Sequence, residues 1–208
     1  MTLSRTTETY IEFLKIGQNA YGDKIRFYEQ HRSIIASLPD SENQELRLYY
    51  LIALFEVGEY QKYLDLVDYM IEEIVEENVY DFNGQDIYYV LLLNKASAHY
   101  NLFQNEQAET LAVQLKKIDP ENPVNRLLLE KIYYRNLSES SRFIKAIGIA
   151  LYFLSGFFIA IQILLVEPFY NQYNLAAQRV WQGVFIFATL LLLFNEIRIK
   201  LVSRSKLK

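Results

Sequence analysis

Two long apolar runs near the C-terminal end limit what this chain can fold into. The first extends from Ala146 to Val166 without a charged residue, and the second extends from Val180 to Asn195. A helix rises about 1.5 Å per residue, so the first run is long enough for the roughly 30 Å hydrocarbon core of a bilayer. Pro168 follows it and is expected to end that helix. The two runs predict a transmembrane hairpin, and the alternative is a pair of buried helices in a soluble domain.

The basic residues around the two runs predict how the hairpin is oriented. The connecting loop carries only Arg179, whereas the outer flanks carry Arg135, Arg142 and Lys145 on one side and Arg198, Lys200, Arg204, Lys206 and Lys208 on the other. Cytoplasmic flanks are enriched in lysine and arginine. We therefore expect both termini in the cytoplasm, the loop outside, and the chain in the inner (cytoplasmic) membrane with two spans. The predicted division is a cytosolic domain (1–137), a juxtamembrane linker (138–145), span 1 (146–166), an external loop (167–178), span 2 (179–196) and a basic tail (197–208).

The part that precedes the spans is predicted to be all-α. Apolar residues recur at helical spacing in seven segments, and no strand pattern of useful length appears. Residues 1–141 have a formal charge of −10 and the remainder +6, which gives the total of −4. An acidic domain argues against binding of nucleic acid, because such binding needs basic groups that neutralise phosphates. The chain has no cysteine, which excludes disulfides and thiolate chemistry. The predicted helices are 6–20, 24–37, 42–57, 60–78, 84–103, 105–117 and 123–136.

The helix breaks recur in register. Gly22 and Pro39 end successive helices of a first unit, Gly58-Glu59-Tyr60 forms the turn of a second, and Ala96, Ala108 and Pro120 mark a third. This pattern resembles the tetratricopeptide repeat, a helix–turn–helix unit of 34 residues. The chain departs from it at Phe103, which stands in place of the turn glycine, at Tyr63, which replaces a packing alanine, and in an insertion before the third unit. The resemblance implies stacked helical hairpins that bind a peptide or a partner protein.

One acidic cluster is a candidate for binding that partner. Glu72, Glu73, Glu76 and Glu77 place pairs of like charge four residues apart on a predicted helix. Such pairs slightly destabilise a helix, which favours a basic protein partner as their reason. The alternative is a solvated helix face. The spacing fits no calcium-binding loop, and we expect neither a metal nor a cofactor.

A second candidate site is the pair Arg26 and His31. Their spacing is similar to the signature of HEPN-type ribonucleases, in which an arginine and a histidine act together on the RNA phosphate. Histidine suits general acid–base catalysis. However, Phe27 stands where that family usually has a polar residue, and a packing role for His31 is the alternative.

Polar and small residues in the spans predict where the hairpin makes contacts. Gln162 and Gln182 are expected at similar depth, and Gly156, Ala160 and Gly183 are small enough for helices to approach closely. The contact is predicted within the hairpin or between copies, and the alternative is that both glutamines reach the headgroups.

The sequence as a whole predicts a membrane-anchored helical-repeat adaptor, not an enzyme, that binds a protein partner at the cytosolic face. The alternative is a membrane effector of a bacterial defence system, in which the hairpin forms a homo-oligomer and perturbs the bilayer. The third hypothesis is a HEPN-like ribonuclease.

Overall fold

The computed structural model describes residues 5–205, which form helices and two short strands joined by turns. The chain divides after Asn125 into two compact units, called here the N-terminal unit and the C-terminal unit. The division falls inside helix α8 (Pro123–Ser140). The all-α prediction is therefore confirmed for the described residues.

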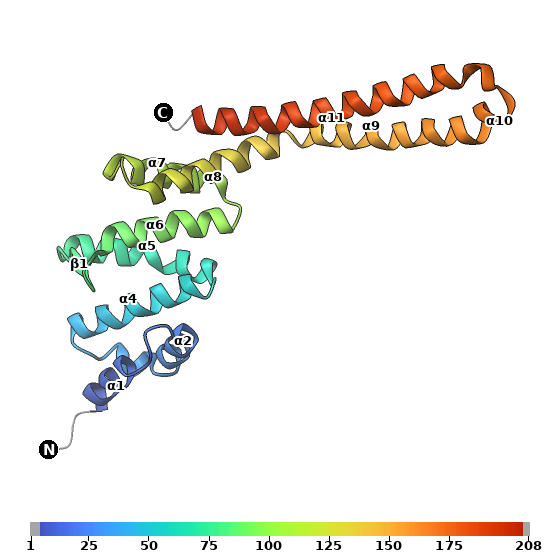
Figure 1. Cartoon of the computed structure of the whole chain (residues 1–208). Coiled ribbons are helices and arrows are strands. Elements are labelled where there is room, and N and C mark those ends of the chain that lie inside the picture. Colours follow the sequence, from blue (N-terminus) through green and yellow to red (C-terminus); the bar gives the residue numbers. More distant parts are fainter. Residues whose placement is uncertain (1–4, 206–208) are drawn as a thin grey trace. The chain divides into compact units, whose positions relative to one another are not determined.

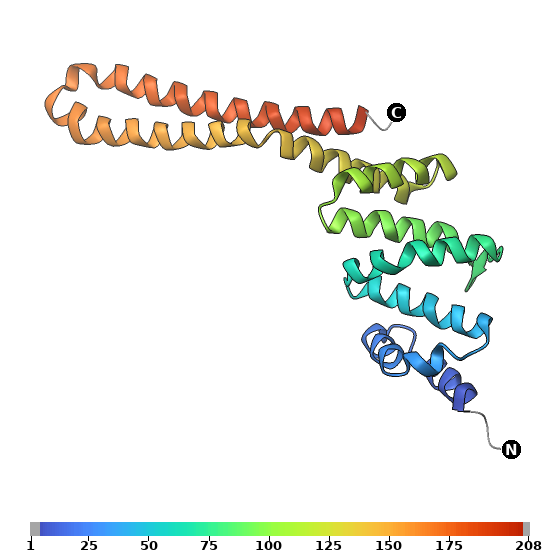
Figure 2. The same cartoon turned by 180° about the vertical axis from the view of Figure 1, so that it is seen from behind.

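The N-terminal unit is built from helices that follow one another in chain order. Figures 1 and 2 show α4 to α7 lying side by side in a stack, so that each helix packs on its neighbours in sequence. This arrangement is expected when a single helical hairpin cannot bury its apolar face alone. The helices are α1 (Arg5–Leu14), α2 (Tyr21–Gln30), α3 (Arg32–Ile35), α4 (Asp40–Glu56), α5 (Tyr60–Glu76), α6 (Ile87–Asn101) and α7 (Asn105–Ile118).

The core of this unit lies between α4, α5 and α6. Its largest buried members are Leu51 and Leu54 from α4, Tyr63 and Ile74 from α5, and Leu91 from α6. Along α5 the buried positions recur every three or four residues, which places them on one face of the helix. Alanines are also buried in α6 and α7, at Ala96, Ala98, Ala108 and Ala112, and Ala98 belongs to the core between α4, α5 and α6.

The insertion before α6 forms a small β-hairpin that the sequence did not predict. Strand β1 (Asp81–Phe82) pairs antiparallel with β2 (Gln85–Asp86). The turn residues Asn83 and Gly84 both have positive φ, which is the conformation that asparagine–glycine turns adopt in two-residue hairpins. Helix α6 consequently begins at Ile87, three residues later than predicted, and the Asp86 carboxylate accepts a hydrogen bond from the Tyr89 N–H at 3.0 Å.

Three helices end in the same left-handed cap. Gly58 (φ 84°), Asn78 (φ 55°) and Phe103 (φ 61°) follow α4, α5 and α6, and in each case the next N–H bonds a carbonyl five residues earlier. This is the Schellman arrangement, for which glycine is the usual residue. Phe103 thus has the backbone conformation of a turn glycine at the position where the repeat pattern departs from glycine.

Gly22, in contrast, does not form the turn that was predicted for it. It lies in the first turn of α2, and the chain instead turns earlier, between the end of α1 at Leu14 and the start of α2 at Tyr21. The predicted helix 24–37 is also divided at His31 into α2 and α3. The correction has a simple cause, because a glycine without a positive φ is tolerated at the start of a helix and marks no boundary there.

The two glycines should respond in opposite directions to alanine. Gly58→Ala is expected to destabilise the protein by about 1–2 kcal/mol, because alanine pays the left-handed backbone penalty even though its Cβ meets nothing closer than 3.9 Å. Gly22→Ala is expected to stabilise α2 by about 0.5–1 kcal/mol, because helical alanine loses less entropy and has open space. Thermal unfolding followed by circular dichroism measures both; equal shifts of one sign would contradict the assigned conformations.

The C-terminal unit is a helical hairpin. After a break at Ser141 the chain continues as α9 (Arg142–Ile161), the π-helical segment η1 (Gln162–Val166) and α10 (Glu167–Phe169). It then turns through η2 (Asn171–Tyr173) and returns as α11 (Asn174–Ser205). Pro168 thus lies inside the helical rod and does not end it at once. Its missing N–H and its ring displace the bond to the carbonyl of Leu164, which explains the wider turn just before it. The predicted basic residues Lys206 and Lys208 lie outside the described residues.

Within the described residues, one continuous helix is long and apolar enough to cross a bilayer. It extends over Arg142–Phe169, has a mean hydropathy of 2.4 in its most apolar window, and that window is 6% buried.

Candidate partner-binding pocket

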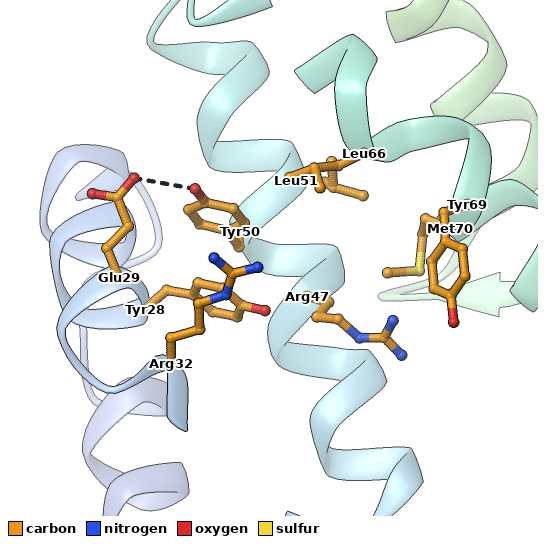
Figure 3. Close-up of a pocket in the computed structure, with 9 residues that line it drawn as sticks. All are labelled: Tyr28, Glu29, Arg32, Arg47, Tyr50, Leu51, Leu66, Tyr69 and Met70. Atoms are coloured by element: carbon orange, nitrogen blue, oxygen red, sulfur yellow. Dashed lines mark hydrogen bonds between the residues drawn. The ribbon is translucent and has the colours of Figure 1, made fainter. Parts of the chain in front are cut away.

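A pocket of about 490 Å³ opens between α2, α3, α4 and α5 (Figure 3). Apolar and aromatic side chains form most of its wall, and two arginines and one glutamate line it as well. This composition is typical of sites that hold an apolar group and orient it with a few polar contacts. The lining residues are Tyr28, Glu29, Arg32, Arg47, Tyr50, Leu51, Leu66, Tyr69 and Met70.

One side of the pocket is a stacked pair of tyrosines. The rings of Tyr28 and Tyr50 are nearly parallel, with centroids 4.2 Å apart, and the Tyr50 hydroxyl donates to Glu29 Oε1 at 3.1 Å. Burial, the negative charge of Glu29 and this hydrogen bond raise the pKa of Tyr50 to about 12. Tyr50 therefore stays neutral at physiological pH and joins α4 firmly to α2.

Arg47, which lines the pocket, also forms an ion pair behind the pocket wall. Its guanidinium, on α4, donates a hydrogen bond to Glu73 Oε1 on α5. Within residues 5–205, Arg47 Nε and Glu73 Oε2 are buried and have no hydrogen-bond partner. Such unsatisfied buried groups are costly, which reduces what the ion pair contributes to stability.

The structure separates the four predicted acidic residues into two pairs. Glu73 and Glu77 face α4, where the Gln44 amide donates to Glu73 at 3.3 Å and to Glu77 at 2.6 Å. Glu72, Glu76 and Glu77 are exposed, and Glu73 is half-buried. Half of the cluster thus serves contacts within the chain, because Glu73 and Glu77 bond residues of α4. Glu72 and Glu76 remain accessible to a partner.

Glu72 and Glu76 lie beside the pocket on α5. Tyr69, Glu72 and Glu76 are spaced by three and four residues on α5, which places them on one helix face. Tyr69 lines the pocket and is 66% exposed, and Leu66 beside it is 41% exposed. An exposed tyrosine and leucine next to two carboxylates can contact both an apolar side chain and a cation. Sequence reasoning missed the pocket, because its members come from four helices with no common motif.

Arg26 and His31 do not form a joint site in the structure. Arg26 is exposed on α2 and lies 3.6 Å from Asp23, while the His31 ring stacks on Phe27 with centroids 4.2 Å apart. The His31 Nδ1–H donates to the Phe27 carbonyl at 2.9 Å, since a carbonyl can only accept. No hydrogen bond or ion pair joins the two residues in the described part of the chain. The packing role expected as the alternative for His31 is the one observed.

In the C-terminal unit, Gln162 bonds two residues other than Gln182. Its amide donates to Asn174 Oδ1, and its carbonyl oxygen accepts from the Trp181 indole N–H at 2.6 Å. Further along the hairpin, Ser155 Oγ donates to the Trp181 carbonyl at 3.1 Å, and the Tyr152 hydroxyl lies 2.9 Å from Thr189 Oγ1. These bonds join α9 and η1 to α11 at successive levels.

Gly148 makes a close contact with α11 that the predicted glycines do not make. A Cβ on Gly148 would lie 2.5 Å from the Leu192 side chain, whereas nothing lies within 4 Å of such an atom on Gly156 or Gly183. Gly156, Ala160 and Gly183 are exposed. The prediction that these three residues make the contact within the hairpin is therefore wrong, since they face away from the other helix of the hairpin. A contact between copies remains a prediction.

Comparison with known proteins gives no relative from which a role could be transferred: no protein-family model matches this chain, and no curated protein or solved structure matches it.

Proposed function

We propose that this protein is a membrane-anchored adaptor whose N-terminal helical unit binds a protein partner at the cytoplasmic face. The observation that carries the proposal is the apolar surface of the continuous helix Arg142–Phe169. Phe153, Phe157 and Leu164 are 77%, 60% and 68% exposed on a helix long enough to span a bilayer. Exposure of so much apolar surface to water is unfavourable, and lipid is the environment that removes the cost.

The second helix of the hairpin is proposed to cross the bilayer as well. α11 carries exposed Phe187, Leu190 and Phe194. Hydrogen bonds with α11 supply partners for the Tyr152 and Ser155 hydroxyls of α9, which would otherwise be exposed to lipid. The basic flanks support the proposal that both termini lie in the cytoplasm. The hairpin then anchors the acidic N-terminal unit beside the membrane.

The pocket on α2–α5 is the proposed partner-binding site. Its apolar wall suits a large apolar side chain, and the neighbouring Glu72 and Glu76 suit basic residues that flank this side chain. The partner is thus proposed to be a basic protein segment with an aromatic or aliphatic anchor. The resemblance of the helix breaks to those of peptide-binding helical repeats supports the same proposal.

Topology is tested by labelling single cysteines in a chain that has none of its own. Asn171→Cys in the connecting loop is expected to react with an impermeant thiol reagent on intact cells, whereas Ser140→Cys is expected to react only after the membrane is opened. Both positions are exposed in the structure. Labelling of Ser140→Cys on intact cells would overturn the orientation, and labelling of both would overturn the anchor.

Partner binding is tested by photo-crosslinking in native membranes. A benzophenone amino acid at Tyr69 is expected to give a discrete adduct with one protein, and the same group at Ile118, which is also exposed, is expected to give none. The double charge reversal Glu72→Lys with Glu76→Lys should remove at least nine-tenths of the Tyr69 adduct. An adduct that is unaffected by the reversal would refute a basic partner, and equal adducts at both positions would refute the site.

A second candidate function is the oligomeric membrane effector. It is favoured by the outward position of Gly156, Ala160 and Gly183, where a helix of another copy can approach closely. The mass of the purified protein in detergent separates the candidates. A monomer or a defined complex with another protein supports the adaptor, and a large homo-oligomer that Gly156→Leu disrupts supports the effector.

A further inference from the structure

A second pocket, of about 510 Å³, lies between the end of α1, the start of α2, α4 and the β-hairpin. It shares no lining residue with the pocket on α2–α5. Its wall is aromatic and aliphatic on one side, with Phe13, Tyr21 and Tyr49, and it carries amide side chains on the other, among them Gln18 and Asn83. A volume of this size is within the range of small-ligand sites.

The only charged residue that lines this pocket is Lys24. Lys24 is buried and retains 7% of its accessible surface. The ammonium donates to the Gln18 carbonyl at 3.0 Å and lies 4.9 Å from the centroid of the Tyr49 ring. Across residues 5–205, no ion pair involves Lys24, so its positive charge faces a carbonyl dipole and an aromatic ring but no carboxylate.

A buried ammonium without a counter-ion is an unusual arrangement. Lysine is almost never buried unless it is paired, because its charge loses the solvation of water. Lys24 also lies in the first turn of α2, where the helix dipole disfavours a cation and favours an anion. Burial lowers the pKa of Lys24, as expected when the charged form lacks compensation. An anion placed in the pocket would be stabilised by both the lysine and the helix terminus.

We propose that this pocket binds an organic carboxylate with an apolar or aromatic body. Lys24 pairs with the carboxylate, while Phe13, Tyr21 and Tyr49 contact the body. The amides of Gln18 and Asn83 supply donors for the remaining oxygen lone pairs. The same chemistry is presented by a free aromatic acid and by the C-terminal residue of a peptide.

The test measures binding of matched probes to the full-length protein in nanodiscs, with empty nanodiscs as the reference. The probes are 3-phenylpropionate and N-acetyl-Leu-Phe, each compared with its primary amide by saturation-transfer NMR and calorimetry. Both acids or one of them should bind, and the corresponding amide should bind at least tenfold more weakly. Binding of phenylpropionate alone identifies a small-molecule site, and stronger binding of the dipeptide identifies a chain terminus.

Variants locate the bound probe. Lys24→Met is expected to weaken binding of the acid at least tenfold, whereas Lys15→Gln, which changes an exposed lysine outside the pocket, is expected to leave it unchanged. The acid–amide comparison on the unmodified protein needs no variant, so it decides the matter even if Lys24→Met fails to fold. Equal binding of acid and amide, undiminished binding to Lys24→Met, or no binding of either acid overturns the proposal.

Discussion

Tyr63→Ala is expected to destabilise the N-terminal unit by about 3–5 kcal/mol, the cost of removing a large buried aromatic side chain. Tyr63 has no exposed surface, its ring packs edge-on against Phe55 with centroids 5.6 Å apart, and its hydroxyl donates to the Leu91 carbonyl at 3.0 Å. It thus joins α4, α5 and α6 at one point. Hydrogen exchange of the α5 and α6 amides in the full-length protein measures the effect, and these amides should exchange at least a hundredfold faster.

Tyr63→Phe is the matched control, because it keeps the ring and removes only the hydroxyl. The expected cost is about 1 kcal/mol, since one hydrogen bond is lost and the Leu91 carbonyl remains within a helix. Burial raises the pKa of Tyr63, so the hydroxyl remains a donor across the physiological range. If both variants cost the same, packing of the ring contributes nothing and the stacked-helix core is misassigned.

Asn125→Leu is expected to destabilise the junction of α7 and α8 by about 3 kcal/mol, from three hydrogen bonds of about 1 kcal/mol each. Asn125 is completely buried. Its amide donates to the Leu115 and Asp119 carbonyls, each at 3.0 Å, and its oxygen accepts from the Tyr89 hydroxyl at 2.6 Å. Leucine has the same number of side-chain heavy atoms and the same branching, and it removes all three hydrogen bonds. Exchange of the α7 amides is the measurement.

Tyr89→Phe separates the contributions at this junction. It removes one of the three bonds and should cost about 1 kcal/mol, and the double variant with Asn125→Leu should cost less than the sum of the two. Strict additivity would show that the Tyr89 hydroxyl and the Asn125 amide do not interact.

The helices could be predicted from the sequence because their signals are local. The predicted segments 42–57 and 60–78 agree with α4 and α5 to within two residues at each end. Apolar spacing and the turn at Gly58 specify both without reference to the rest of the chain. The widened turn before Pro168 was missed, because a proline changes the helix only through its position relative to a carbonyl four residues earlier.

The pockets and polar contacts were not predictable in the same way. Glu73 and Glu77 look equivalent to Glu72 and Glu76 along α5, and only the position of Gln44 on α4 distinguishes them. Lys24 likewise gives no sign in the sequence that it is buried. Such distinctions depend on which residues, far apart in the chain, the packing of helices brings together.

The polar bonds along the C-terminal hairpin also bear on how the proposed membrane anchor would be inserted. Ser155 on α9 and Gln162 in η1 bond partners on α11, and a slide of one helix past the other would separate these pairs. A polar side chain that enters hydrocarbon without its partner is costly. Under the proposal that both helices cross the bilayer, we expect them to enter it as one preassembled pair, after both have been synthesised.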